Sequence, residues 1–302
     1  MTVIGDGQAG LPPQRRNRLQ AIVGRITGHP LVQRIQAVVG IANDAGAPLL
    51  AAALAFNTMF AIIPGLLLLS GVLGWAIDDP VARAELLADL VARLPPLADA
   101  IADSLDGVVQ ARGGLTIVGI VGLLWGASNF YAVLDEVMRR IFAGGAPRSM
   151  IAQRVRGFVT VFGLVALVFG AVLLGGLWTI VGSTVGDLGG LLVLSLVGPL
   201  MFVLLSVVAA FVAYRFVPAA APSWRAALPP AIVAGIGIGL LTNLFSLLAP
   251  VLVGGLSGFG VLATIFGAFV WLNLCFQILL WGAAWARYQR DRERLEGSAT
   301  QL

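Results

Sequence analysis

The sequence predicts an all-α protein that crosses a membrane several times. Of its 302 residues, 59% are hydrophobic and only 11% are charged, and the mean hydropathy is +0.94. Soluble domains carry about 25% charged residues, so this composition indicates a chain that folds in lipid. Long apolar stretches recur along the chain, and each exceeds the ~20 residues that a helix needs to cross the hydrocarbon layer.

The first 46 residues predict a basic cytoplasmic segment. They contain no short apolar core followed by a small-residue cleavage site, so we expect no cleavable signal peptide and the first span directs insertion. Apolar residues at helical spacing predict a helix on the membrane surface, although a short water-facing helix packed on the bundle fits equally well. These residues are Ile35, Val38, Val39 and Ala42.

Residues 47–286 predict a transmembrane domain of six helices, followed by a cytoplasmic tail at 287–302. The first and last spans are long for one crossing, so we expect them to tilt, bend or project from the membrane. Rows of small residues in several spans predict close helix packing, as in Ala231, Gly235 and Gly239. The predicted spans are 47–77, 114–134, 157–182, 190–214, 226–249 and 257–286.

Arginine placement predicts the orientation of these spans. All 19 basic residues are arginine, and all but Arg83, Arg93 and Arg112 fall on one side of the predicted membrane. The positive-inside rule makes that side cytoplasmic, which places both termini in the cytoplasm and the protein in the bacterial inner membrane. The three exceptions lie in the outer loop, 78–113, where Pro95 and Pro96 separate two predicted amphipathic helices.

The predicted spans contain no Asp, Glu, Lys, Arg or His. Carriers coupled to protons or cations usually keep ionisable groups in the membrane, so a proton-coupled carrier is disfavoured. Neutral polar groups remain, and they either form interhelical hydrogen bonds or line a path for a substrate. The candidate path residues are Asn57, Thr58, Ser128, Asn129, Asn243, Asn273 and Gln277, and Thr242 lies beside them.

A charged cluster follows the second span. Asp135 and Arg139, like Glu136 and Arg140, are four residues apart and therefore share a helix face. The cluster is a candidate for gripping a lipid headgroup or a partner protein. It equally fits a helix anchor that sets topology.

The sequence contains no pattern typical of a zinc site, a nucleotide-binding loop or a nuclease. The chain has one Cys, Cys275, and one His, His29, too few for a usual zinc site. The glycines at 235, 237 and 239 lie mid-span, without the strand and turn that a phosphate loop requires. We expect no cofactor, no metal and no enzymatic activity. The basic residues flank apolar segments, so we expect lipid and not nucleic acid as the partner.

Several motifs resemble the YihY/BrkB family of bacterial inner-membrane proteins over residues 30 to 286. The stretch NDAGAPLLAAALAFNTMF carries the family's acid, here Asp44, and its LAF step; Asn57 stands where the family commonly has Tyr. WGASNFYAVLDEVMRRIF, the turn before Trp224 and the last helix also match in order. The resemblance implies six spans with cytoplasmic termini. It adds Asp44 to the headgroup or partner candidates.

Family members are linked by name to ribonuclease BN, to serum-resistance virulence factors and to a proposed exporter of envelope lipids. This chain lacks the His and Asp constellation of a metal-dependent nuclease. We therefore expect a transporter or flippase for a lipid or amphipathic envelope precursor. The alternative is a non-transporting scaffold or envelope-integrity protein. Expected partners are membrane lipids, a second copy of the chain, or envelope proteins.

Overall fold

The computed structural model describes residues 30–60, 114–143, 189–255 and 261–299, and every regular element within these ranges is a helix. The predicted all-α class is confirmed for this part of the chain. The labelled helices are α2 (Pro30–Asp44), α6 (Gly114–Ile141), α8 (Gly189–Phe216), α9 (Trp224–Gly255) and α10 (Val261–Ala299). A further helix, Ala47–Phe60, follows α2.

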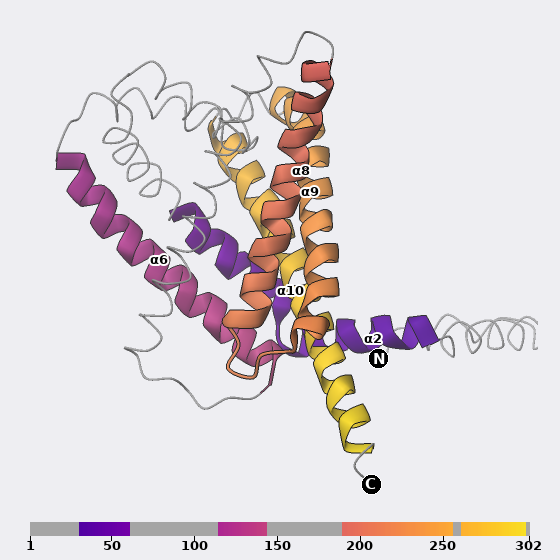
Figure 1. Cartoon of the computed structure of the whole chain (residues 1–302). Helices are drawn as coiled ribbons and strands as arrows, with labels where there is room; N and C mark the ends of the chain where they lie inside the picture. The colour runs from indigo at the N-terminus through magenta and orange to yellow at the C-terminus, as the bar shows by residue number, and fades with distance from the viewer. Residues whose placement is uncertain (1–29, 61–113, 144–188, 256–260, 300–302) are drawn as a thin grey trace, which may run out of the picture.

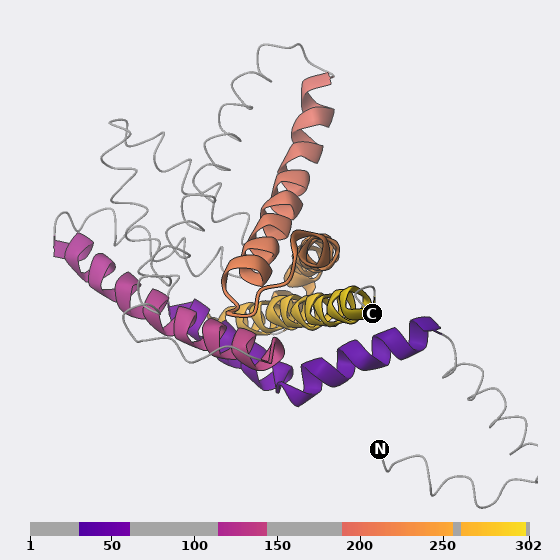
Figure 2. The same cartoon turned by 60° about the horizontal axis from the view of Figure 1, so that its bottom comes forward.

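Helix α10 forms the axis of the bundle (Figure 1). Helices α8 and α9 pack against each other, and α9 packs along α10. Helix α6 slopes away on the other side and meets α10 near its own C-terminus, while α2 lies across that end of the bundle (Figure 2). The bend between α2 and the Ala47–Phe60 helix is 58°.

Two helical stretches among the described residues are long and apolar enough to cross a membrane, Trp224–Leu248 and Ile265–Ala299, and a third appears if the bent pair counts as one span. A shorter apolar helix covers Leu200–Phe216. The predicted span at 157–182 and the outer loop at 78–113 lie outside the described residues. The six-span count therefore stays a prediction.

Helix α10 is longer than the span predicted within it. Its 39 residues correspond to about 58 Å at 1.5 Å per residue, roughly twice the 30 Å of the hydrocarbon layer. The predicted tail continues the helix through Ala299, and this end projects beyond the rest of the bundle (Figure 1). Helix α6 likewise continues past the predicted boundary at 134 to Ile141.

Small residues set the spacing between α8 and α9, as their pattern predicts. A Cβ atom built on Gly235 would lie 2.6 Å from the backbone nitrogen of Val207, and one on Gly239 would collide with the Val203 side chain. Both glycines therefore let the two backbones approach more closely than any side chain would permit. Ala231, one turn earlier in the row, is fully buried.

The main core lies where α6 and α8 end and α9 begins. Its largest fully buried side chains include Tyr214, Phe142 and Met138. The Tyr214 hydroxyl donates a 2.6 Å hydrogen bond to the carbonyl of Leu279 on α10, and a side chain on Gly282 would collide with that hydroxyl. This end of the bundle is thus the one fixed by large side chains and specific polar contacts.

Candidate functional site

Two contacts place polar residues of different helices at the level of residues 271–277 of α10 along the bundle axis. We call this position along the axis their depth. The indole Nε1 of Trp271 donates to the Thr242 hydroxyl at 3.2 Å, which places Asn243 of α9 at this level. The rings of Phe130 on α6 and Phe276 on α10 have their centres 5.9 Å apart. Ser128 and Asn129, which precede Phe130, therefore lie at a similar depth.

The Ala47–Phe60 helix reaches the same level. Ala55 belongs to one buried cluster with Trp271 and Leu272, and Met59 packs against that cluster. In the sequence, Asn57 and Thr58 lie between Ala55 and Met59. Four helices thus place neutral polar side chains at one depth, which we call the polar belt: Asn57, Thr58, Ser128, Asn129, Thr242, Asn243, Asn273 and Gln277.

Most hydrogen bonds of the belt stay within a single helix. The Asn57 amide donates to the Ala53 carbonyl at 2.8 Å, and the Asn243 amide donates to Gly239 at 2.9 Å. Thr58 likewise bonds the Leu54 carbonyl of its own helix. An amide that donates once to a carbonyl one turn back keeps its oxygen and a second N–H for another partner. The interhelical alternative fits Thr242 but not these three side chains.

Asn273 and Gln277 form a pair on α10. The Gln277 Nε2 donates to the Asn273 Oδ1 at 3.4 Å, as their spacing of four residues predicts. Both are half-buried, as are Asn57, Thr58, Ser128 and Asn129, whereas Asn243 is exposed. The candidate path residues are therefore accessible in part, and none of them is fully enclosed in the core.

The charged cluster at the end of α6 is organised around one carboxylate. Glu136 pairs with Arg139 and also with Arg140, whose Nε lies 2.7 Å from its Oε1. Asp135 is half-buried next to this group, and Asp44 is exposed at the end of α2. All these candidates lie at the end of the bundle to which α6 descends, away from the polar belt.

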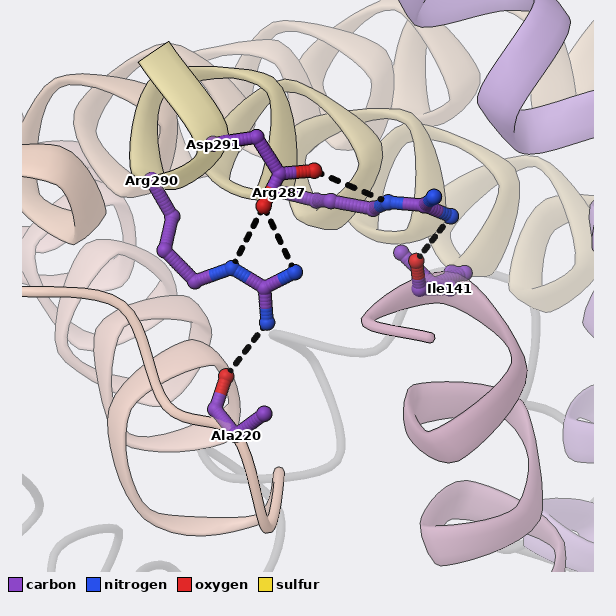
Figure 3. Close-up of polar contacts among 5 residues, drawn as sticks. All are labelled: Ile141, Ala220, Arg287, Arg290 and Asp291. Atoms are coloured by element: carbon purple, nitrogen blue, oxygen red, sulfur yellow. Dashed lines mark hydrogen bonds and ion pairs between the residues drawn. The ribbon is translucent and has the colours of Figure 1, made fainter. Parts of the chain in front are cut away.

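A second charged cluster, which the sequence did not single out, joins three parts of the chain (Figure 3). Arg287 donates from Nη1 to the carbonyl of Ile141, the last residue of α6, at 2.8 Å. Arg290 donates from Nη1 to the carbonyl of Ala220, between α8 and α9, at 2.7 Å. Asp291 accepts from both guanidinium groups, at 3.4 Å from Arg287 and 2.7 Å from Arg290.

This cluster, which we call the arginine latch (Arg287, Arg290 and Asp291), binds one backbone carbonyl at the end of α6 and one in the α8–α9 connection. The last carbonyls of a helix have no partner within it, and a cation at that end is favoured by the helix dipole. Arg290 is only 5% exposed, and its guanidinium also lies 5.5 Å from the centre of the Phe142 ring. The latch therefore fixes α6 and the α8–α9 turn to α10.

Ser223 strengthens the same junction. Its hydroxyl accepts a 3.1 Å hydrogen bond from the Ala226 amide and so caps the start of α9. The hydroxyl also donates to the Glu293 carboxylate on α10, at 2.8 Å from Oε2. The spacing of Arg287 and Asp291 was the only sequence signal for this region, because the other partners come from distant segments.

No group of three or more His, Cys, Asp or Glu side chains in the described ranges is placed to hold a metal ion. Within these ranges the polar belt lies in apolar helices, and the ion pairs lie near the C-terminal ends of α6 and α10. This arrangement defines an integral membrane protein of the helical-bundle class.

The chain belongs to the family described as virulence factor BrkB, whose model matches residues 38–301. The resemblance to the YihY/BrkB family is thereby confirmed. Comparisons with curated proteins and with solved structures return no match.

Proposed function

We propose that this protein is a six-span protein of the bacterial inner membrane, with both termini in the cytoplasm, that moves a lipid or amphipathic envelope precursor across the bilayer. The observation that carries the proposal is the polar belt. Side chains from four helices lie at one depth. Three of them, Asn57, Thr58 and Asn243, donate a hydrogen bond to a carbonyl of their own helix and do not link two helices.

The depth of the belt favours a substrate path. From Asn273 and Gln277 to Arg287 the helix advances about 15–21 Å at ~1.5 Å per residue. Half of a ~30 Å hydrocarbon layer is about 15 Å, so a latch at the headgroup level would put the belt near the midplane. Transporters commonly bind their substrates near this depth.

The chemistry of the belt favours an amphiphile as the substrate. Amides and hydroxyls can hydrogen-bond to sugar, glycerol or phosphate oxygens, and they carry no charge that would have to be buried in lipid. A small inorganic ion would need charged or carbonyl ligands, whereas an amphiphile can keep its tail in the bilayer while its head passes the belt. No cofactor or metal enters this proposal, and we propose no enzymatic activity.

The orientation has support from the described arginines. Arg139, Arg140 and Arg215 lie in the last turns of α6 and α8, and the latch residues lie beside them on α10. By the positive-inside rule this end faces the cytoplasm.

The test is lipid movement in proteoliposomes with purified protein and headgroup-labelled phospholipids and lipid-linked envelope precursors. Wild-type protein is expected to accelerate movement between leaflets. The Asn273→Leu/Gln277→Leu double variant is expected to lose most of this acceleration, because it removes both amides of α10 at similar side-chain volume.

Ser206→Ala is the matched control. Ser206 is a half-buried polar residue of α8 that bonds its own helix at Phe202, and it lies outside the belt. The control should move lipid as the wild type does. If correctly folded wild-type protein moves none of these lipids, the transport proposal is wrong.

The alternative function is a scaffold or envelope-integrity protein that acts through partner proteins or as a homo-oligomer. The projecting end of α10 favours it, because residues 292–299 are all exposed and carry the Arg292–Glu296 ion pair away from the bundle. The family description names a virulence factor, which fits either function. Absence of lipid movement together with co-purification of a partner through this helix end would favour the scaffold.

A further inference from the structure

Arg215 differs from the other arginines at its end of the bundle. It lies in the last turn of α8, and its guanidinium carbon is 5.8 Å from the ring centres of both Phe216 and Trp224. Its Nε atom is buried and has no hydrogen-bond partner. By contrast, Arg287 and Arg290 each donate to a backbone carbonyl and to Asp291.

Two aromatic rings do not satisfy the hydrogen-bond donors of a guanidinium group. The rings attract its positive charge, but they provide no lone pair for the in-plane N–H groups. Buried N–H groups in proteins are almost always paired. Carboxylates pair with other arginines in the described part of the chain, namely Arg139, Arg140, Arg287, Arg290 and Arg292. Arg215 is therefore left with an unmet preference for an anionic acceptor.

The surface around Arg215 is apolar and aromatic. Phe216 is 52% exposed and Trp224 is 60% exposed, and Leu228, one turn further along α9, is 48% exposed. Trp224 also packs on Phe211, with ring centres 5.2 Å apart, which fixes its orientation. A cation bordered by exposed Trp and Leu is typical of the boundary between headgroups and hydrocarbon.

Two positive groups border this place. Arg225 is exposed directly after Trp224, and the first turn of α9 carries the positive end of its helix dipole. The nearby carboxylate of Glu293 is bonded to Ser223. A phosphate diester could accept from both Nη groups of Arg215 at once, which is a bidentate geometry that guanidinium favours.

We infer that Arg215 and Trp224 form a binding site for the phosphate of an anionic phospholipid, with its acyl chains along the exposed face of α9 at Leu228. The lipid is a bound component of the protein surface and is separate from any transported substrate. The inference does not depend on the proposed transport, because the site lies at the end of α8 and not in the polar belt.

Native mass spectrometry of the purified full chain tests this inference. The protein is titrated with phosphatidylglycerol and, separately, with phosphatidylcholine of the same acyl chains, and dissociation constants are obtained for each bound lipid. Wild-type protein is expected to bind its first phosphatidylglycerol at least about tenfold more tightly than phosphatidylcholine, a difference of about 1.4 kcal/mol. Equal affinities for the two lipids would overturn the inference without any variant.

Arg215→Gln is expected to abolish the preference for phosphatidylglycerol, and Arg215→Lys is expected to retain part of it as a point charge. Arg294→Gln is the matched control, because Arg294 is an exposed arginine near the end of α10 and its loss changes net charge equally. A preference that survives in folded Arg215→Gln, or that Arg294→Gln loses to the same extent, would contradict the site.

Inorganic phosphate serves as a competitor in the same titration. A lipid site should keep its first phosphatidylglycerol in millimolar phosphate, because the acyl chains contribute apolar contacts that the free ion lacks. Displacement by phosphate at concentrations comparable to the lipid would identify a soluble anion as the ligand and overturn the lipid assignment.

Discussion

Replacing Arg290 by Gln should destabilise the bundle much more than the same replacement at Arg292, two residues further along α10. Gln ends where the Arg Nε lies, two bonds short of the Nη1 that reaches the Ala220 carbonyl. Leaving that carbonyl without a donor costs about 1–3 kcal/mol. Losing the cation above the Phe142 ring adds about 0.5–2 kcal/mol.

The ion pair itself adds little to this sum. The Asp291 side chain is 42% exposed and keeps Arg287 as a partner, so the lost charge pair contributes at most ~1 kcal/mol. The expected total is about 1.5–6 kcal/mol. Among the described residues Arg292 pairs with Glu296, and these side chains are 53% and 62% exposed, so Arg292→Gln should cost less than about 0.5 kcal/mol.

The assay is the free energy of unfolding in mixed micelles with increasing dodecyl sulfate, followed by tryptophan fluorescence for the wild type and both variants. Both substitutions remove one ion-paired arginine from the same helix. The difference between their free energies of unfolding therefore measures the effect of the buried position and of the contact with the Ala220 carbonyl. If Arg290→Gln and Arg292→Gln are equally stable within about 0.5 kcal/mol, the latch does not hold this end of the bundle together.

Two packing predictions follow from the glycines. Gly282→Ala should destabilise the bundle because its Cβ would collide with the Tyr214 hydroxyl, and Tyr214→Phe should recover part of the loss, so the double variant is more stable than Gly282→Ala alone; additive effects in unfolding experiments would contradict the contact. Gly235→Ala should cost about 1–3 kcal/mol by overpacking against the Val207 backbone. Gly237→Ala, whose Cβ would lie 3.2 Å from the Cγ2 methyl of Ile278 and meet no backbone atom within 4 Å, should cost clearly less in the same measurement.

Much of the helical framework could be predicted from local pattern. Helices α8 and α9 begin and end within a few residues of the predicted spans, except that α9 continues to Gly255, because uninterrupted apolar runs between arginines mark a span directly. The row that ends in Gly235 and Gly239 also predicted close packing correctly. The lengths of α6 and α10 were underestimated, because charged residues end a hydrophobic run without ending a helix.

The polar belt was predicted as a set of residues but not as an arrangement. Composition identifies every amide in an apolar run, yet it does not tell which amides share a depth. That information comes from contacts between helices, such as Trp271 with Thr242 and Phe130 with Phe276. The hydrogen bonds of Asn57 and Asn243 to carbonyls of their own helices also depend on backbone geometry that only the folded chain provides.

The latch shows why charged residues at a helix end are difficult to rank from sequence. Arg287, Arg290, Arg292 and Arg294 all occur within one charged run, and local spacing offers several of them a carboxylate partner. What separates Arg287 and Arg290 is a pair of carbonyl acceptors 146 and 70 residues away in the chain. Arg292 and Arg294 are exposed on α10, and Arg292 pairs with Glu296 of its own helix. The same run therefore contains two arginines that join distant parts of the chain and two that are exposed, and the tertiary contacts of α10 decide which are which.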